Sequence, residues 1–219
     1  FGPALVTGLG TYGSESFAAR LLGADQMRTF ETMYADAPYG RASSVNAGMT
    51  GFYVCNNVGI AFRCFATGIL FGLGSIWFLV SNGLFLGGVL GHLTRAGLGE
   101  NIFTFISAHG PWELIAIVIS GAAGLQMGLA LVVTGGRTRL GSLQARGPEL
   151  IRQVAGAAAF LVVAALLEAW VSPAALPMEA KLGLGAGGWV LVAGILALGG
   201  RRRPRPPDVA AFSAGGPGE

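Results

Sequence analysis

Charged residues are scarce in this sequence. Of its 219 residues, 14 are Lys or Arg and 11 are Asp or Glu, which together make 11% of the chain. A typical soluble domain contains about 25% charged residues. Hydrophobic residues make up 53%, and such a balance does not suit a surface covered by water. The composition therefore excludes an ordinary soluble domain.

Cysteine and the common catalytic motifs are also scarce. The two cysteines, Cys55 and Cys64, lie in apolar sequence, where a buried thiol behaves as a small hydrophobic group. Two thiols give no metal framework, and neither has a histidine close in sequence. A Gly-x-Ser-x-Gly elbow and a phosphate-binding glycine loop followed by Lys are both missing. We therefore expect a protein that is not an enzyme and has no cofactor. The net charge of +3 gives no reason to expect nucleic acid as a partner.

Long apolar runs are abundant instead. Residues 64–94, 114–136, 153–167 and 182–200 contain no Asp, Glu, Lys or Arg, and a membrane-crossing helix needs about 20 apolar residues. A backbone in lipid must satisfy its own hydrogen bonds, and the alternating pattern of a barrel strand is missing. The sequence therefore predicts an all-α fold, a polytopic transmembrane helix bundle in a lipid bilayer.

The arginines predict how the bundle is oriented. One group follows the apolar run that ends near residue 136, and another follows the last run. Their members are Arg137, Arg139, Arg146 and Arg152, and then Arg201, Arg202, Arg203 and Arg205. Because Lys and Arg concentrate in cytoplasmic loops, both groups and the C-terminus are expected in the cytoplasm, with an external turn at Ser172, Pro173 and Pro177.

The chain divides into three predicted segments. Residues 1–45 combine the tail of a first span with an amphipathic interfacial segment, which ends in a turn at Ala37-Pro38-Tyr39-Gly40. Residues 46–200 form the bundle, and residues 201–219 form a disordered cytoplasmic tail rich in proline and glycine. Within the bundle, residues 64–80 are expected to span. Residues 82–97 either extend that helix with a kink or form a re-entrant segment, and Pro111 is expected to break or kink a later helix.

Glycines recur four residues apart within the apolar runs. Small residues at this spacing let helix backbones approach closely, so we expect a tight bundle and a homodimer. The predicted helix-packing residues are Gly68, Gly72, Gly87, Gly91, Gly121, Gly124 and Gly128.

A few polar residues interrupt the apolar sequence and form the candidate site. We predict an internal polar network of Asn56, Asn57, Arg63, Asn82, His109, Glu113 and Glu168. His109 and Glu113 are four residues apart and share a helical face. A charge in a membrane needs a partner, and the candidates for Glu113 are Arg63 and His109.

Three interpretations of this network stay open. The first is a structural network built on Arg63 and Glu113. The second is a pathway for an ion or a substrate. Alternatively, His109, Glu113 and Glu168 bind zinc or another divalent ion. The paired histidines of a zinc protease motif are missing, so no metal is expected.

Several short motifs resemble those of the stage II sporulation protein M family of bacterial integral membrane proteins. They lie in order between residues 46 and 173: GFY at 51–53, NN at 56–57, FRCFATG at 62–68, NG at 82–83, HGPWEL at 109–114, SGAAGL at 120–125 and EAWVSP at 168–173.

This resemblance implies a multi-span protein of the bacterial inner membrane. The sporulation member of the family resembles an anchor for peptidoglycan-degrading partners, and the family offers no catalytic residues to carry over. We therefore expect a scaffold that holds other membrane or cell-envelope proteins. The alternatives are a transporter or channel whose pathway is lined by Arg63, His109 and Glu113, and a metal-dependent intramembrane hydrolase.

Overall fold

The computed structural model describes residues 1–35 and 43–199, and every regular element in these ranges is a helix. This confirms the predicted all-α fold. The elements are α1 (Gly2–Gly13), α2 (Glu15–Leu22), α3 (Ala24–Ala35), α4 (Ser43–Ala66), η1 (Thr67–Ile69), α5 (Leu73–Arg95), α6 (Gly99–Ser107), α7 (Gly110–Val132), α8 (Arg139–Leu166), η2 (Leu167–Val171) and α9 (Met178–Gly199). The turn predicted at residues 37–40 and the tail at 201–219, with Arg201 to Arg205, lie outside the described residues.

Four helical segments of the described chain are long and apolar enough to cross a membrane. They are Leu73–Arg95, Gly110–Val132, Arg139–Val171 and Met178–Gly199. Much of their surface is apolar and exposed, as with Trp77 at 70% and Val190 at 73%. In a membrane protein, lipid covers such a surface. The chain is therefore a membrane protein, as its composition predicts.

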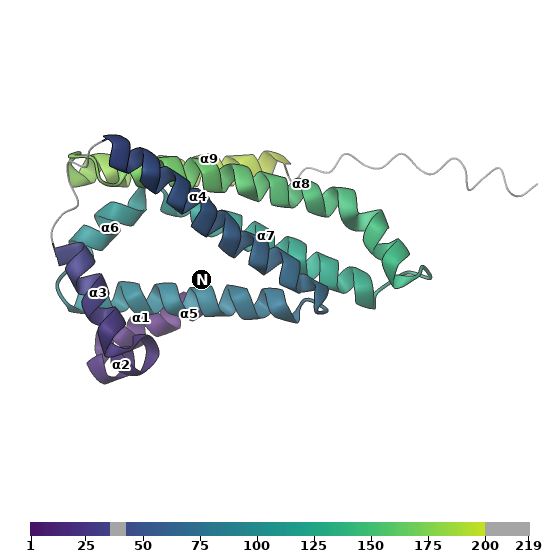
Figure 1. Cartoon of the computed structure of the whole chain (residues 1–219), viewed down its shortest axis with the longest axis horizontal. Coiled ribbons are helices and arrows are strands. Elements are labelled where there is room, and N and C mark those ends of the chain that lie inside the picture. Colours follow the sequence, from purple (N-terminus) through teal and green to yellow (C-terminus); the bar gives the residue numbers. More distant parts are fainter. Residues whose placement is uncertain (36–42, 200–219) are drawn as a thin grey trace, which may run out of the picture.

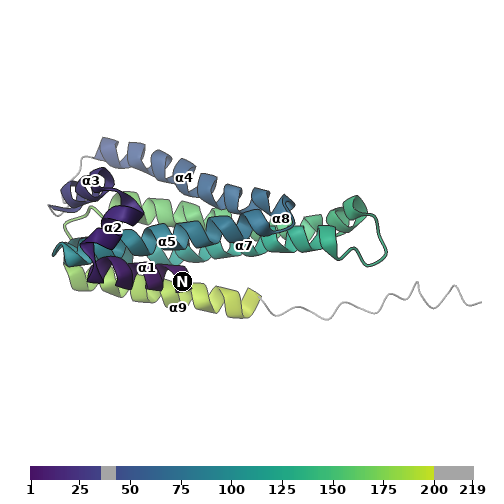
Figure 2. The same ribbon diagram turned by 90° about the horizontal axis from the view of Figure 1, so that it is seen from below.

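The long helices form two groups that meet at one end. Figure 1 shows α5 along one side and α8 with α9 along the other, while α4 and α7 cross obliquely between them. The turn η1 joins α4 to α5 near the C-terminal half of α7, where an added side-chain carbon at Gly68 would meet Gly124. At the opposite end, α6 and the first half of α9 lie against the start of α7, because an added side-chain carbon at Gly185 would meet Ser107 and one at Gly188 would meet Pro111 and Trp112. Figure 2 shows α9 running along α7.

The boundary between α4 and α5 differs from the prediction. Residues 64–80 were expected to form one span, but the chain turns at Thr67–Ile69 and restarts at Leu73. Phe71 and Gly72 adopt positive φ angles of 55° and 85°, and glycine tolerates that conformation without steric cost. The buried Ser75 hydroxyl donates to the Cys64 carbonyl at 2.6 Å, which ties the two helix ends together.

Helix α5 continues without interruption through Ser81, Asn82 and Gly83. The Asn82 side chain donates to the Phe78 carbonyl of its own helix at 2.7 Å, so the polar residue does not break the helix. Of the two alternatives for residues 82–97, the structure shows the helix extension, which ends at Arg95.

The N-terminal helices cover α5. Helix α1 lies along it, and the hydroxyls of Thr7 and Thr11 donate to α5 carbonyls. Helices α2 and α3 then fold across α5, where Leu22 and Met27 pack against Leu93 in a buried apolar cluster. The segment predicted to be amphipathic therefore forms two short helices, each with an apolar side on the bundle.

Pro111 begins a helix and does not kink one. Helix α6 ends at Ser107, and α7 begins at Gly110 with Pro111 in its first turn, where the missing N–H of proline breaks no helical hydrogen bond. Further along α7, an apolar core joins α4, α7 and α8 through Ala61, Ala116 and Leu161. His109 therefore lies directly before the first residue of α7, at one end of this apolar core.

Candidate functional site

A group of polar side chains lies where α6, α7, η2 and α9 meet. We call it the polar cluster, and its members are Asn57, His109, Glu113, Glu168, Ser172 and Lys181. Asn57, His109, Glu113 and Glu168 belong to the predicted network. The structure therefore brings together four residues that are as far apart in sequence as 57 and 168.

His109 is the most enclosed ligand-type residue of the cluster, with 5% of its surface exposed. Its Nδ1 lies 3.0 Å from the Ser172 hydroxyl, and that hydroxyl donates to the Phe105 carbonyl at 2.7 Å. Its Nε2 faces Glu113 with 4.0 Å between Nε2 and Oε2, which is too long for a hydrogen bond. The ring is thus held by Nδ1 and presents Nε2 to the carboxylate.

Glu168 reaches the cluster from a short π-helical stretch, Leu167–Val171. A π turn changes the direction in which side chains point and is frequent at functional sites. The Glu168 carboxylate accepts from the Asn57 amide at 3.5 Å, and the Asn56 amide donates to Asn57 Oδ1 at 2.9 Å. Helix α4 therefore helps to position a carboxylate carried by another helix.

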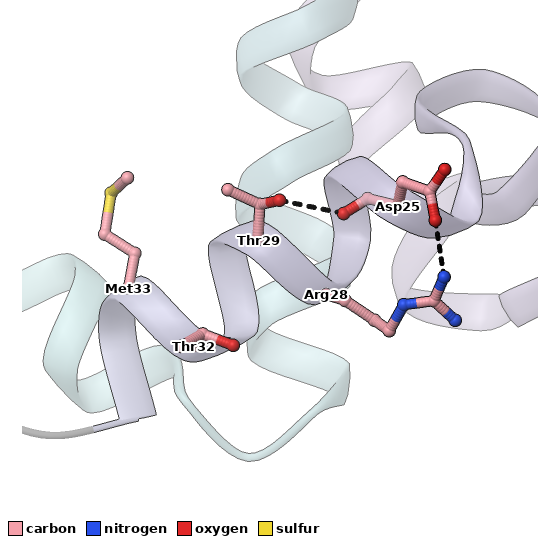
Figure 3. A pocket seen from close by; sticks show the side chains of 5 residues that line it. All are labelled: Asp25, Arg28, Thr29, Thr32 and Met33. Carbon is pink, nitrogen blue, oxygen red and sulfur yellow. Dashed lines mark hydrogen bonds and ion pairs between the residues drawn. The ribbon is translucent and has the colours of Figure 1, made fainter.

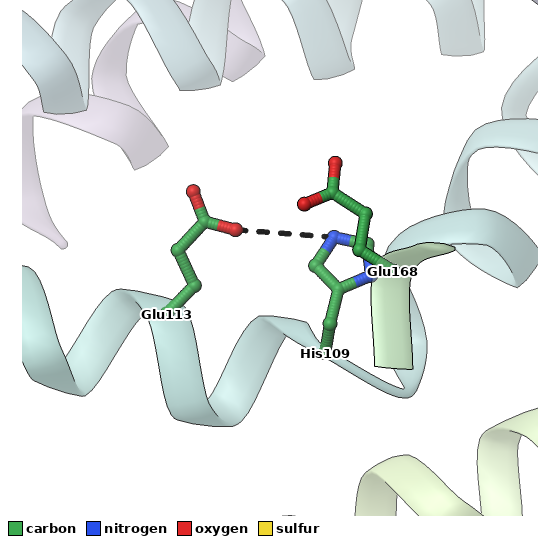
Figure 4. A group of neighbouring side chains, drawn as sticks. All are labelled: His109, Glu113 and Glu168. Carbon is green, nitrogen blue, oxygen red and sulfur yellow. Dashed lines mark ion pairs between the residues drawn. The ribbon is translucent and has the colours of Figure 1, made fainter. Parts of the chain in front are cut away.

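One atom each from His109, Glu113 and Glu168 can act as a metal ligand, and these atoms all lie within 4.8 Å of one another. Figure 4 shows the two carboxylates and the imidazole pointing toward a common space. His109 is buried, whereas both glutamates are partly exposed. The arrangement can hold a cation or share a proton between its carboxylates.

The sequence analysis placed Ser172 in the external turn but not in the polar network, and it did not single out Lys181. Lys181 is 1% exposed, and its ammonium donates to the Ser172 carbonyl at 2.6 Å. Its position at the edge of the last apolar run is the sequence signal that could have identified it, because an intramembrane charge needs a partner. Ser172 gives no comparable signal, since its role depends on a turn formed far along the chain from His109.

Two predicted network residues lie away from the cluster. Arg63 is exposed near the end of α4, and the ion pairs among the described residues do not include it. Asn82 is on α5 and bonds within that helix. The structure does not bring Arg63 to Glu113, because Arg63 points outward close to the η1 turn while Glu113 lies at the opposite end of the bundle.

A second histidine and carboxylate meet outside the cluster. His92 Nε2 of α5 lies 2.8 Å from Glu31 Oε1 of α3, and His92 is 3% exposed. Nearby on α3, a shallow depression is lined by Asp25, Arg28, Thr29, Thr32 and Met33 (Figure 3). Arg28 pairs there with Asp25, so this surface is polar and held by local contacts.

The predicted packing glycines all lie at close helix contacts within this chain. A side-chain carbon at Gly87 or Gly91 would overlap the α1 backbone, and one at Gly68 or Gly128 would overlap a neighbouring backbone near η1. The three others meet side chains of α5 and α7 at the same end; they are Gly72, Gly121 and Gly124.

The comparisons with known proteins agree with the motifs. The model of the family described as stage II sporulation protein M matches residues 1–173. No curated protein and no solved structure matches the chain. The matched range runs from α1 through η2 and Ser172, and so contains every member of the polar cluster except Lys181. The chain belongs to the stage II sporulation protein M family.

Proposed function

We propose that this protein is a non-enzymatic scaffold of the bacterial inner membrane that anchors partner proteins of the cell-envelope remodelling class. The observation that carries the proposal is an exposed polar surface that several contacts hold against the apolar helix α5. This surface is formed by α2 and α3, residues 15–35, and is called the platform below.

The platform is attached to the bundle at several points. The Phe30 and Phe85 rings meet edge to face with centroids 6.0 Å apart, and Glu31 pairs with His92. The Asn101 amide donates to the Tyr34 carbonyl at 2.8 Å. A surface fixed in this way loses little conformational entropy when a partner binds.

The outer side of the platform suits a protein partner better than lipid. Arg28 and Asp25 have side chains that are 70% and 98% exposed, and Thr29 and Thr32 lie beside them with Met33, which is 56% exposed. Exposed charged groups are costly in lipid, whereas Arg and Met are enriched in protein interfaces.

The position of the platform supports a partner outside the cytoplasm. Arg139 of α8 lies over the Phe71 ring beside η1, with 5.8 Å between its guanidinium carbon and the ring centroid. The arginine-rich connection therefore shares an end with η1, and the platform covers the other half of α5. With arginines on the cytoplasmic side, the platform faces outward, where the family resemblance implies peptidoglycan-degrading partners.

The test is crosslinking from a photoreactive amino acid placed at Thr32 in membranes of a cell that produces the protein. We expect one discrete protein adduct, which disappears when Arg28→Glu is added. The matched control places the same group at Trp77, which is highly exposed on α5, and should give lipid adducts only. Equal protein adducts from both positions, or none at Thr32, would contradict the scaffold.

The alternative functions have their own outcomes. Ion or solute flux in proteoliposomes that is lost in Glu113→Gln and His109→Ala would favour a transporter. Hydrolysis of a membrane substrate that requires a metal would favour the hydrolase. The homodimer stays a prediction, because the seven predicted packing glycines already contact elements of the same chain.

A further inference from the structure

The polar cluster contains three ligand-type side chains whose arrangement goes beyond what a scaffold needs. Ligand atoms of His109, Glu113 and Glu168 lie within 4.8 Å of one another, on two elements that are separate in sequence. They converge from the start of α7 and from the π-helical stretch η2 (Figure 4). An acidic cluster alone is common on proteins, but here a buried imidazole is aimed at both carboxylates.

The hydrogen bonds around His109 determine which ring nitrogen is free to bind. The Phe105 carbonyl can only accept, so the Ser172 hydroxyl must use its single hydrogen on that carbonyl, at 2.7 Å. Ser172 can then only accept from His109, at 3.0 Å, which places the hydrogen of a neutral ring on Nδ1. The lone pair of Nε2 therefore faces Glu113 and Glu168, as it does in histidines that bind metals and are oriented by a second residue.

The charge of the two carboxylates also favours cation binding. Two ionised carboxylates this close repel each other, and a positive charge beside them lowers that repulsion. A divalent ion would cancel the two negative charges and leave a neutral site. A proton shared between the carboxylates would compete with a metal ion for this position.

The donor set selects the class of ion. Imidazole nitrogen suits zinc and other transition metals, whereas magnesium and calcium prefer sites made only of oxygen. Three ligands at about 2.1 Å around a tetrahedral zinc lie about 3.4 Å apart. The present separations of up to 4.8 Å require only small side-chain movements to reach that geometry.

We propose that His109, Glu113 and Glu168 bind one divalent transition-metal ion of the zinc class, with Ser172 orienting the histidine. Three protein ligands leave a fourth position open to water. The site lies at the end of the bundle where the external turn is predicted, so an ion can reach it without crossing the membrane. The proposal does not depend on the scaffold role.

The experiment measures zinc on the purified full chain in detergent. The protein is incubated with zinc chloride, dialysed, and analysed for metal and protein content. We expect one zinc per chain in the wild type, and a large loss in Glu113→Gln and in Glu168→Gln. Glu31→Gln is the matched control, because it makes the same change at the other pair of histidine and glutamate, and it should keep its zinc.

Two further measurements separate binding from folding. Each variant must elute as the same species and keep its helical circular dichroism spectrum. Cobalt in place of zinc reports the ligand geometry through its visible absorption, and Ser172→Ala should weaken metal affinity about 10–100-fold while leaving the ligands in place. A wild type that retains no more zinc than the Glu113→Gln/Glu168→Gln double variant overturns the proposal.

Discussion

At the residue scale, close helix contacts in this protein depend on positions that have no side chain. Gly124 shows this most clearly, because an added carbon there would overlap the Ser75 hydroxyl and would also meet the carbonyl oxygens of Cys64 and Phe65 at 2.8 and 2.9 Å. Two of these obstacles are backbone and cannot rotate away. The Ser75 hydroxyl and the Cys64 carbonyl also form the hydrogen bond that joins α4 to α5. Gly124 therefore packs against the turn between these two helices.

Gly124→Ala should therefore destabilise the protein by about 1–3 kcal/mol, the usual cost of overpacking a filled core. Thermal unfolding in detergent, followed by circular dichroism, measures the change. Gly59→Ala is the control, since Gly59 on α4 has open space around it, and it should raise stability by up to about 1 kcal/mol because alanine favours a helix. Equal stability of the two variants would show that the contact at Gly124 relaxes at no cost.

The sequence predicted residues that share a local pattern and missed those that depend on distant contacts. His109 and Glu113 were identified because a spacing of four places them on one helical face. The contacts of Ser172 with His109 and of Lys181 with the Ser172 carbonyl were missed, because neither follows a local sequence pattern. Arg63 was predicted to contact Glu113 from its charge alone, and charge does not say which side of α4 faces inward.

At the element scale, α1 is held to α5 by hydrogen bonds between side chain and backbone. Thr7 Oγ1 lies 2.9 Å from the Leu84 carbonyl and Thr11 Oγ1 lies 3.0 Å from the Gly88 carbonyl, each across 77 residues. Each hydroxyl shares its single hydrogen between this carbonyl and one of α1 itself, which lies at 2.9 Å. Gly87 and Gly91 allow the approach, because side chains there would overlap α1. Small residues with hydroxyl bonds between helices are a common means of association in lipid.

Replacing both hydroxyls by methyl groups should loosen α1 without changing side-chain shape. We expect Thr7→Val with Thr11→Val to cost about 1 kcal/mol in total, since such bonds in membranes average about 0.6 kcal/mol each. Hydrogen exchange of residues 2–13 should rise while that of α7 stays the same. Thr94→Val serves as the control, because Thr94 bonds only to the Leu90 carbonyl of its own helix, and it should leave the exchange of α1 unaltered.

The packing of neighbouring elements also explains why the span predicted at residues 64–80 differs from the helix Leu73–Arg95. Hydropathy located the apolar runs but could not divide residues 64–94, since Gly72 and Gly83 look alike in sequence. The structure turns at Gly72, where φ is positive, and continues through Gly83, which packs near Pro3. Which glycine ends a helix is decided by the neighbouring elements, here the contact of η1 with α7 and of α1 with α5.

At the scale of the whole molecule, the two ends of the bundle differ in chemistry. One end has η1 beside the arginine-rich connection to α8, and the other has the platform and the polar cluster. If the arginine-rich end is cytoplasmic, as the bias of Lys and Arg toward that side predicts, both the platform and the proposed metal site lie on the outer side. The scaffold proposal and the metal proposal therefore share one requirement that a labelling experiment can test.

Single cysteines at the two ends give the orientation directly. The exposed Cys55 is replaced by serine, while Cys64 is buried and stays. In intact bacterial cells, a maleimide that cannot cross membranes should label Arg28→Cys on the platform, and it should label Arg137→Cys in the arginine-rich connection only after lysis. The reverse pattern would put the platform in the cytoplasm and remove the argument for an envelope partner. Labelling of both cysteines in intact cells would mean that α5 does not separate the two ends across the bilayer, because α5 links the platform to the η1 end.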